Sequence, residues 1–294
     1  MIDWRPIEGV DVDGINGDLV HGEPTVDVAY YLPDNLDERH KEKVTLELLM
    51  KGHVDAKKIF GDAGVQVNLT SFTTGYLDPS LFEVRSTAGP NMPTGRFTNM
   101  YRNAERHPSV LSSEAQAAFE AVIPDTPGAD RTVHLVVLED VFMSFHERVD
   151  FRTFELKTLS TGGLSFPGYM YGATIPRYMR GVISVTDITK GETSWKTVAH
   201  ELGHKLLNVS HEYRSTSPAH EVNAEGGLML YGQGTDIPSG PEGRYHHERL
   251  HVSPFIYRLD DDGNKVWNPD YSGDGFYYDP IYDGISVDLD AEAS

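Results

Sequence analysis

The segment "TVAHELGHKLLNVSHEYR" (residues 197–214) contains the side chains best suited to hold a metal ion. His200 and His204 are four residues apart, so on a helix both imidazoles point to the same side and can bind one cation. Glu201, next to the first histidine, is placed to reach a metal-bound water rather than the metal itself. Zinc lowers the pKa of such a water to about 7, and a carboxylate can take its proton as the water attacks a carbonyl carbon. The pattern therefore predicts a catalytic Zn²⁺ at His200 and His204, with Glu201 as general base.

The third zinc ligand is less directly indicated by the spacing. A catalytic zinc usually has three protein ligands and one open position. The residues after the helix that could supply the third ligand are His211, Glu212, Glu221 and Glu225. The chain has no cysteine, which excludes disulfide bonds, thiolate zinc sites and thiol nucleophiles. Any metal must therefore be held by histidine, aspartate or glutamate.

The charge balance limits the partners that the protein can have. There are 25 basic and 45 acidic residues among 294, which gives a formal net charge of −20. This balance argues against nucleic acid and against an anionic membrane surface, because both need clustered Lys and Arg. A well-solvated acidic surface explains the charge, and bound Ca²⁺ is the alternative. The Asp-rich segments "DVDGINGD" (11–18) and "DDDGN" (260–264) are either calcium loops or simple turns.

The hydrophobic pattern predicts a soluble protein without membrane insertion. Apolar runs such as "VHLVVL" (133–138) are far too short to cross a bilayer. Residues 1–10 lack the basic start and apolar core of a signal peptide, so secretion is an open alternative rather than an expectation.

The order of the expected elements indicates an α+β fold. Strands are expected at 25–33, 65–72, 131–140, 169–175 and 180–187, and helices at 37–61, 112–123 and 194–207. This order predicts a mixed twisted sheet with two long helices packed against it. We divide the chain into an N-terminal loop segment (1–24), a catalytic subdomain (25–207) containing the active-site helix 194–207, and a mostly irregular C-terminal subdomain (208–294).

Three further segments accompany the two-histidine pattern. "AKKIFGDAGVQVNLTSF" (56–72) joins a helix to a strand, "GGLMLYG" (226–232) reads as a tight turn, and His211-Glu212 is followed by Arg214. Together these segments resemble the metzincin zinc peptidases, and in particular the astacin and serralysin groups, although they do not assign a subfamily. The resemblance covers residues 25–235, apart from an insertion at 75–130 to which it does not extend.

The resemblance implies that His211 is the third zinc ligand. The metzincin pattern H-E-x-x-H-x-x-G-x-x-H places its glycine at Leu207 and its last histidine at Ser210, one residue earlier than Asn208 and His211. Asparagine is the next-best residue after glycine for a left-handed turn. We therefore expect one extra helical residue, then the same turn on Asn208.

The resemblance also implies a function. Met229 would lie in a Met-turn (226–232) beneath the zinc, and Tyr231 would bind zinc or stabilise the transition state. The protein would be a zinc-dependent endopeptidase, and a protein or peptide substrate would extend along an edge strand within 165–176. The sequence "INGD" (15–18) faintly resembles an inhibitory pro-segment in which Asp18 would cap the zinc.

Three alternatives stay open. Glu225 is spaced from His204 as the third ligand is in thermolysin-like enzymes, but Gly226 and Gly227 disfavour the helix on which it would lie. The protein could instead be a non-proteolytic binding or structural protein stabilised by zinc, or a zinc hydrolase of a non-peptide amide. Glu201 favours an enzyme, because a purely structural zinc does not need it.

Overall fold

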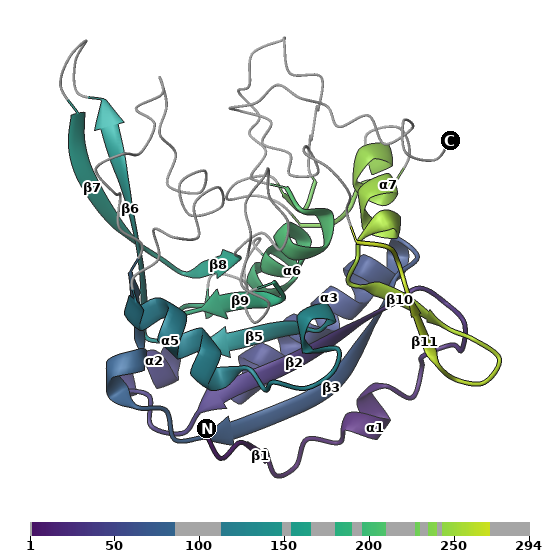
Figure 1. Ribbon diagram of the computed structural model, residues 1–294, viewed down its shortest axis with the longest axis horizontal. Coiled ribbons are helices and arrows are strands. Elements are labelled where there is room, and N and C mark those ends of the chain that lie inside the picture. The colour runs from purple at the N-terminus through teal and green to yellow at the C-terminus, as the bar shows by residue number, and fades with distance from the viewer. Residues whose placement is uncertain are drawn as a thin grey trace.

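The main sheet is mixed and provides the scaffold of the molecule (Figure 1). The computed structural model describes residues 2–85, 113–148, 154–165, 180–189, 196–209, 227–229, 235–239 and 243–270. The strands follow the order β1-β3-β2-β5-β9-β8, with β10 paired to β2 and β11 paired to β10. Their bounds are β1 Arg5–Pro6, β2 Thr25–Pro33, β3 Gln66–Gly75, β5 Val133–Val137, β8 Gly163–Ser165, β9 Val182–Val185, β10 Ile256–Leu259 and β11 Lys265–Trp267.

The centre of this sheet is parallel and its edges are antiparallel. Strands β3, β2, β5 and β9 run in the same direction, whereas β1 is antiparallel to β3 and β8 is antiparallel to β9. Every described residue of β5 and β9 is buried, which is typical of parallel strands covered on both faces. Among the described residues, the antiparallel strand β8 forms the edge beyond β9.

Helices cover the sheet on both sides. Tyr30 and Tyr31 are neighbours in β2, so their side chains point to opposite faces. Tyr30 contacts His53 of helix α3 (Leu46–Asp62), whereas Tyr31 contacts Trp4, whose indole donates a hydrogen bond to the carbonyl of Val122 at the end of α5 (Ser113–Val122). Figure 1 shows α3 behind the sheet and α5 in front of it. Helix α6 (Thr197–Leu207) packs against α3.

A second, three-stranded sheet extends from this body. Its order is β4-β6-β7, with bounds β4 Glu83–Arg85, β6 Asp140–Arg148 and β7 Phe154–Thr161. Strands β6 and β7 pair in antiparallel fashion over eight residue pairs. The other helices among the described residues are α1 Val12–Ile15, α2 Glu38–Lys43, α7 Arg244–Val252 and the 3₁₀ turns η1 Pro79–Leu81 and η3 Ala129–Arg131.

The expected mixed sheet with several helices is confirmed, and four of the five expected strands are present as β2, β3, β5 and β9. The fifth, 169–175, lies outside the described residues. The expected helix at 37–61 is divided into α2 and α3, because Thr45 caps a new helix with its side chain. The β6–β7 hairpin was not expected, because the sequence there lacks a turn signal of the Asn-Gly type.

The expectation of an irregular C-terminal third is wrong for residues 244–267. This segment forms α7, β10 and β11, and β10 pairs with β2 in antiparallel fashion. Asp260 accepts hydrogen bonds from the backbone of Asp262 and Asn264, so the "DDDGN" segment is the turn of the β10–β11 hairpin. The C-terminal segment is therefore part of the same sheet as the N-terminal strands.

Candidate metal centre

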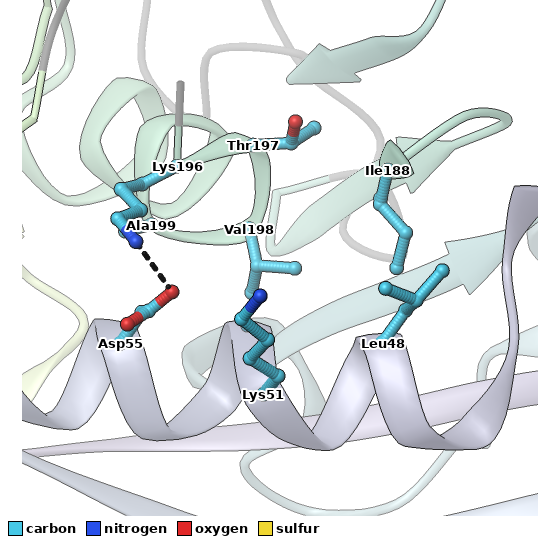
Figure 2. Close-up of a pocket in the computed structure, with 9 residues that line it drawn as sticks. Leu48, Lys51, Asp55, Ile188, Lys196, Thr197, Val198 and Ala199 are labelled. Atoms are coloured by element: carbon cyan, nitrogen blue, oxygen red, sulfur yellow. Dashed lines mark hydrogen bonds and ion pairs between the residues drawn. The ribbon is translucent and has the colours of Figure 1, made fainter. Parts of the chain in front are cut away.

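Helix α6 carries the two-histidine pattern and is buried over its whole length. Its first turn rests on α3, where Lys196 forms an ion pair with Asp55 at 3.0 Å and Val198 faces Gly52 (Figure 2). A β-carbon at position 52 would lie 2.5 Å from Cγ2 of Val198, so the glycine permits this close packing. The helix begins at Thr197 with Lys196 as its N-cap, three residues after the expected start at 194.

His200 and His204 lie side by side on α6. Their ring centroids are 4.6 Å apart and the rings are inclined at 82°. The Nδ1 atom of His200 is 2.7 Å from the carbonyl oxygen of Leu228, and that of His204 is 2.8 Å from the carbonyl oxygen of Val209. Because a carbonyl only accepts, each Nδ1 carries the hydrogen and each Nε2 carries the lone pair. This is the tautomer that a metal ligand needs.

Burial keeps both rings neutral. It lowers the pKa of His200 to about 4, and it lowers the pKa of His204 well below its usual value, to which the neighbouring His200 also contributes. Two neutral imidazoles whose Nδ1–H groups are anchored on backbone carbonyls match the donor set of a zinc site. The residues present therefore fit the metal that the sequence implies.

The turn at residues 227–229 lies directly against α6. Leu228 supplies the carbonyl that orients His200, and Met229 is fully buried. A β-carbon at Gly203 would lie 2.6 Å from the sulfur of Met229, so the glycine between the two histidines allows this contact. Met229 thus lies against the helix segment that carries the pair.

Glu201 faces the edge strand β8. Its side chain is 4% exposed, and Oε2 has no hydrogen-bond partner among the described residues. A β-carbon at Gly163 would lie 2.5 Å from Oε1 of Glu201, so this glycine makes room for the carboxylate. Burial raises the pKa of Glu201 to about 8, although the positive charge of Lys205 acts in the opposite direction. The carboxyl group is therefore placed beside an edge strand, in a dry environment.

The C-terminus of α6 turns as expected. Asn208 is the C-cap, with φ 53° and ψ 48°, and it is the only non-glycine residue with positive φ in the described part of the chain. The expected left-handed turn on Asn208, after one extra helical residue at Leu207, is confirmed.

The structure describes only some of the expected site residues. His211, Tyr231 and Glu225 lie outside the described residues, as does most of the expected edge strand at 165–176. Asp18, considered as a zinc cap, forms an ion pair with Lys57 of α3 at 2.5 Å.

Sequence reasoning did not identify the groups that support the site. Hydrogen bonds to backbone carbonyls, such as those of Leu228 and Val209, cannot be recognised from the pattern of side chains. The Gly162-Gly163 pair can be seen in the sequence, but the sequence does not indicate that Glu201 lies against it. Arg249 of α7, which binds the carbonyls of residues 207 and 208, was likewise not expected.

A second group of possible metal ligands lies at the start of α2. Asp37, His40 and Glu139 have ligand atoms within 4.8 Å of one another. Asp37 caps α2 by accepting hydrogen bonds from the backbone and Nδ1 of His40, and Glu139 accepts from the backbone of Asp37. These hydrogen bonds explain the arrangement as a helix cap, and we assign no metal to it.

Comparisons with known proteins do not assign a family. No protein-family model and no curated protein matches the sequence. Among solved structures, the chain is similar to one described as "Structure of a chaperone-substrate complex", with 11% identity and a TM-score of 0.31. The match covers 88% of this chain and 33% of that one, so the chain spans about a third of its length. In the described part of the chain, none of the helices has the length and apolar character needed to cross a membrane.

Proposed function

We propose that the protein is a zinc-dependent endopeptidase of the metzincin type. The observation that carries this proposal is the arrangement on α6: two neutral histidines anchored through Nδ1, with the buried carboxylate of Glu201 beside them. Purely structural zinc sites usually have four protein ligands and no adjacent carboxylate that could accept a proton. The ligands proposed are His200, His204 and His211.

Two features next to the histidine pair support the metzincin assignment over a chance match. The helix that carries the pair ends in a left-handed turn, and a buried methionine lies beneath it. Because Gly203 and Met229 lie in close contact, the pattern and the proposed Met-turn form one packed unit.

The proposed mechanism uses the residues as follows. A zinc ion would polarise the scissile carbonyl and acidify the attacking water. Glu201 accepts the proton of that water and passes it to the leaving nitrogen, and Tyr231 donates a hydrogen bond to the oxyanion. The burial that raises the pKa of Glu201 makes it a stronger base once ionised, and the charges of Lys205 and of a divalent cation favour ionisation.

The position of β8 favours a peptide substrate. This strand is the last of the sheet among the described residues, and its Gly163 lies against the Glu201 carboxylate. An extended peptide that pairs with an edge strand is held by its backbone, which brings successive carbonyls past the catalytic group. A small non-peptide amide would gain nothing from this edge.

Glu201→Gln tests the proposal. The amide keeps the shape of the side chain and cannot take the proton, so cleavage of an unstructured protein such as casein should fall by at least about 100-fold while zinc stays bound. A wild-type protein that binds zinc but cleaves no peptide would favour the non-proteolytic role or another amide substrate. Cleavage that survives the substitution would exclude Glu201 as the base.

A further inference from the structure

Arg249 of α7 is a buried cation at the C-terminal end of α6. Its side chain is 1% exposed, and it comes from a segment far along the chain. Nε donates to the carbonyl of Leu207 at 2.5 Å, and Nη2 donates to the carbonyl of Asn208 at 3.1 Å. One guanidinium therefore binds two consecutive carbonyls at the point where the helix turns.

These carbonyls need such a partner. The last carbonyls of a helix have no partner within it, and they form the negative end of the helix dipole. The side chain of Asn208 does not supply one, because its Oδ1 and Nδ2 atoms are buried and have no hydrogen-bond partner among the described residues. In the described part of the molecule, the left-handed turn is thus held by Arg249 and not by the residue that forms it.

The next carbonyl along the chain orients a proposed metal ligand. Val209 accepts the hydrogen bond from Nδ1 of His204 at 2.8 Å. Three consecutive carbonyls therefore have fixed roles: those of residues 207 and 208 bind Arg249, and that of residue 209 fixes the ring and tautomer of His204. A shift of the first two would move the third.

Helix α7 is itself fixed to the sheet. The chain continues from it into β10, which pairs with β2, and Arg131 donates to the carbonyl of Pro254 at 2.7 Å between the two elements. Arg249 therefore lies on a helix whose following segment is anchored to the main sheet.

We propose that Arg249 is a positioning residue for the metal centre, which makes the C-terminal helix α7 part of that centre. This inference rests on the proposed zinc function. Arg249 acts through the turn at Asn208 and the Val209 carbonyl on His204, and it does not touch the metal or the substrate.

The test compares Arg249→Lys and Arg249→Met with Arg258→Met. Arg258, in β10, binds the carbonyl of Gly22 from the surface, with a side chain that is 57% exposed, and serves as the matched control. Zinc affinity is measured by competition with a chelator, and the stability of the zinc-free proteins by urea unfolding. Loss of an outer partner of a metal ligand typically weakens metal binding about 10- to 100-fold.

We expect zinc affinity to fall about 10- to 100-fold in Arg249→Met. The fall should be smaller in Arg249→Lys, because lysine keeps the charge but cannot bind both carbonyls in a fixed geometry. The control should bind as the wild type does. Variants at position 249 that are less stable but bind zinc with unchanged affinity would overturn the proposal. If Arg249→Met does not fold, the lysine variant decides by the same criterion.

A second readout separates this proposal from the function on which it rests. In the zinc-free protein, long-range proton–nitrogen NMR spectra report which imidazole nitrogen of His204 carries hydrogen. We expect the Nδ1–H form in the wild type and a mixture of tautomers in Arg249→Lys; an unchanged tautomer would contradict the proposal. A wild type that binds no zinc would contradict the proposed function itself, whatever the tautomer.

Discussion

Gly203 and Met229 are in direct contact, so close that a β-carbon on the glycine would lie 2.6 Å from the methionine sulfur. The contact joins the helix segment between His200 and His204 to the turn whose Leu228 carbonyl orients His200. The lack of a side chain at position 203 therefore allows the turn that orients His200 to pack against the helix.

Gly203→Ala should destabilise the protein, although alanine normally favours a helix. The added methyl group would overlap with Met229 and lie 3.0 Å from Leu228, and overpacking of this kind costs about 1–3 kcal/mol. Gly61→Ala in α3 is the matched control, because a β-carbon there meets nothing within 4 Å, and it should be neutral or stabilise by up to about 1 kcal/mol. Urea unfolding measures both; equal effects would show that the contact is not tight.

Asn208→Gly should be tolerated and Asn208→Val should not. The residue has φ 53°, where a β-branched side chain is strained by about 1–3 kcal/mol, whereas glycine is not. Glycine also removes two buried polar atoms that have no hydrogen-bond partner among the described residues. The free energy of unfolding should therefore be lower than the wild-type value in Asn208→Val. In Asn208→Gly it should equal or exceed the wild-type value. A glycine variant less stable than the valine variant would contradict this account of the turn.

Gly163→Ala should reduce turnover without removing the metal. The new methyl group would lie 2.5 Å from the Glu201 carboxylate and push it out of place, while His200 and His204 are untouched. A displacement of about 1 Å can cost about 100-fold in rate. We expect kcat for peptide cleavage to fall about 10- to 100-fold, with zinc content unchanged. Loss of zinc in this variant would mean that β8 supports the ligands and not the base.

Acid should destabilise the protein through His53. This residue is buried against Tyr30, and burial lowers its pKa from 6.5 to about 4. Since the unfolded state then binds the proton more readily, the free energy of unfolding falls as the pH drops from about 6.5 to 4, by about 3 kcal/mol at most. His53→Gln should flatten the profile in this range. His134, whose pKa burial also lowers to about 4, stays in both proteins, so the difference isolates His53.

The local features of the site could be predicted from the sequence, whereas its long-range supports could not. The helix, the shared face of His200 and His204, and the left-handed turn on Asn208 depend on neighbouring residues, and the sequence indicated them correctly. Gly163 reaches Glu201 across 38 positions of sequence, and Arg249 reaches the carbonyl of Leu207 across 42.

The fold shows the same division. The parallel strands β2 and β5 were visible as apolar runs, because burial on both faces leaves a continuous hydrophobic pattern. The β10–β11 hairpin was not, since its edge position lets polar residues such as Lys265 alternate with Val266 in a segment rich in Asp and Gly. Pairing partners are set by tertiary structure, which a single sequence does not display.

The most direct test of the central claim is the zinc content per chain, by elemental analysis, of the wild type beside His204→Ala and His211→Ala. We predict one zinc per wild-type chain, none in His204→Ala, and none or a much weaker site in His211→Ala. A wild type without zinc, or equal zinc in the wild type and His204→Ala, would contradict the proposed metal centre. Tight zinc in His211→Ala alone would move the third ligand to a residue such as Glu225.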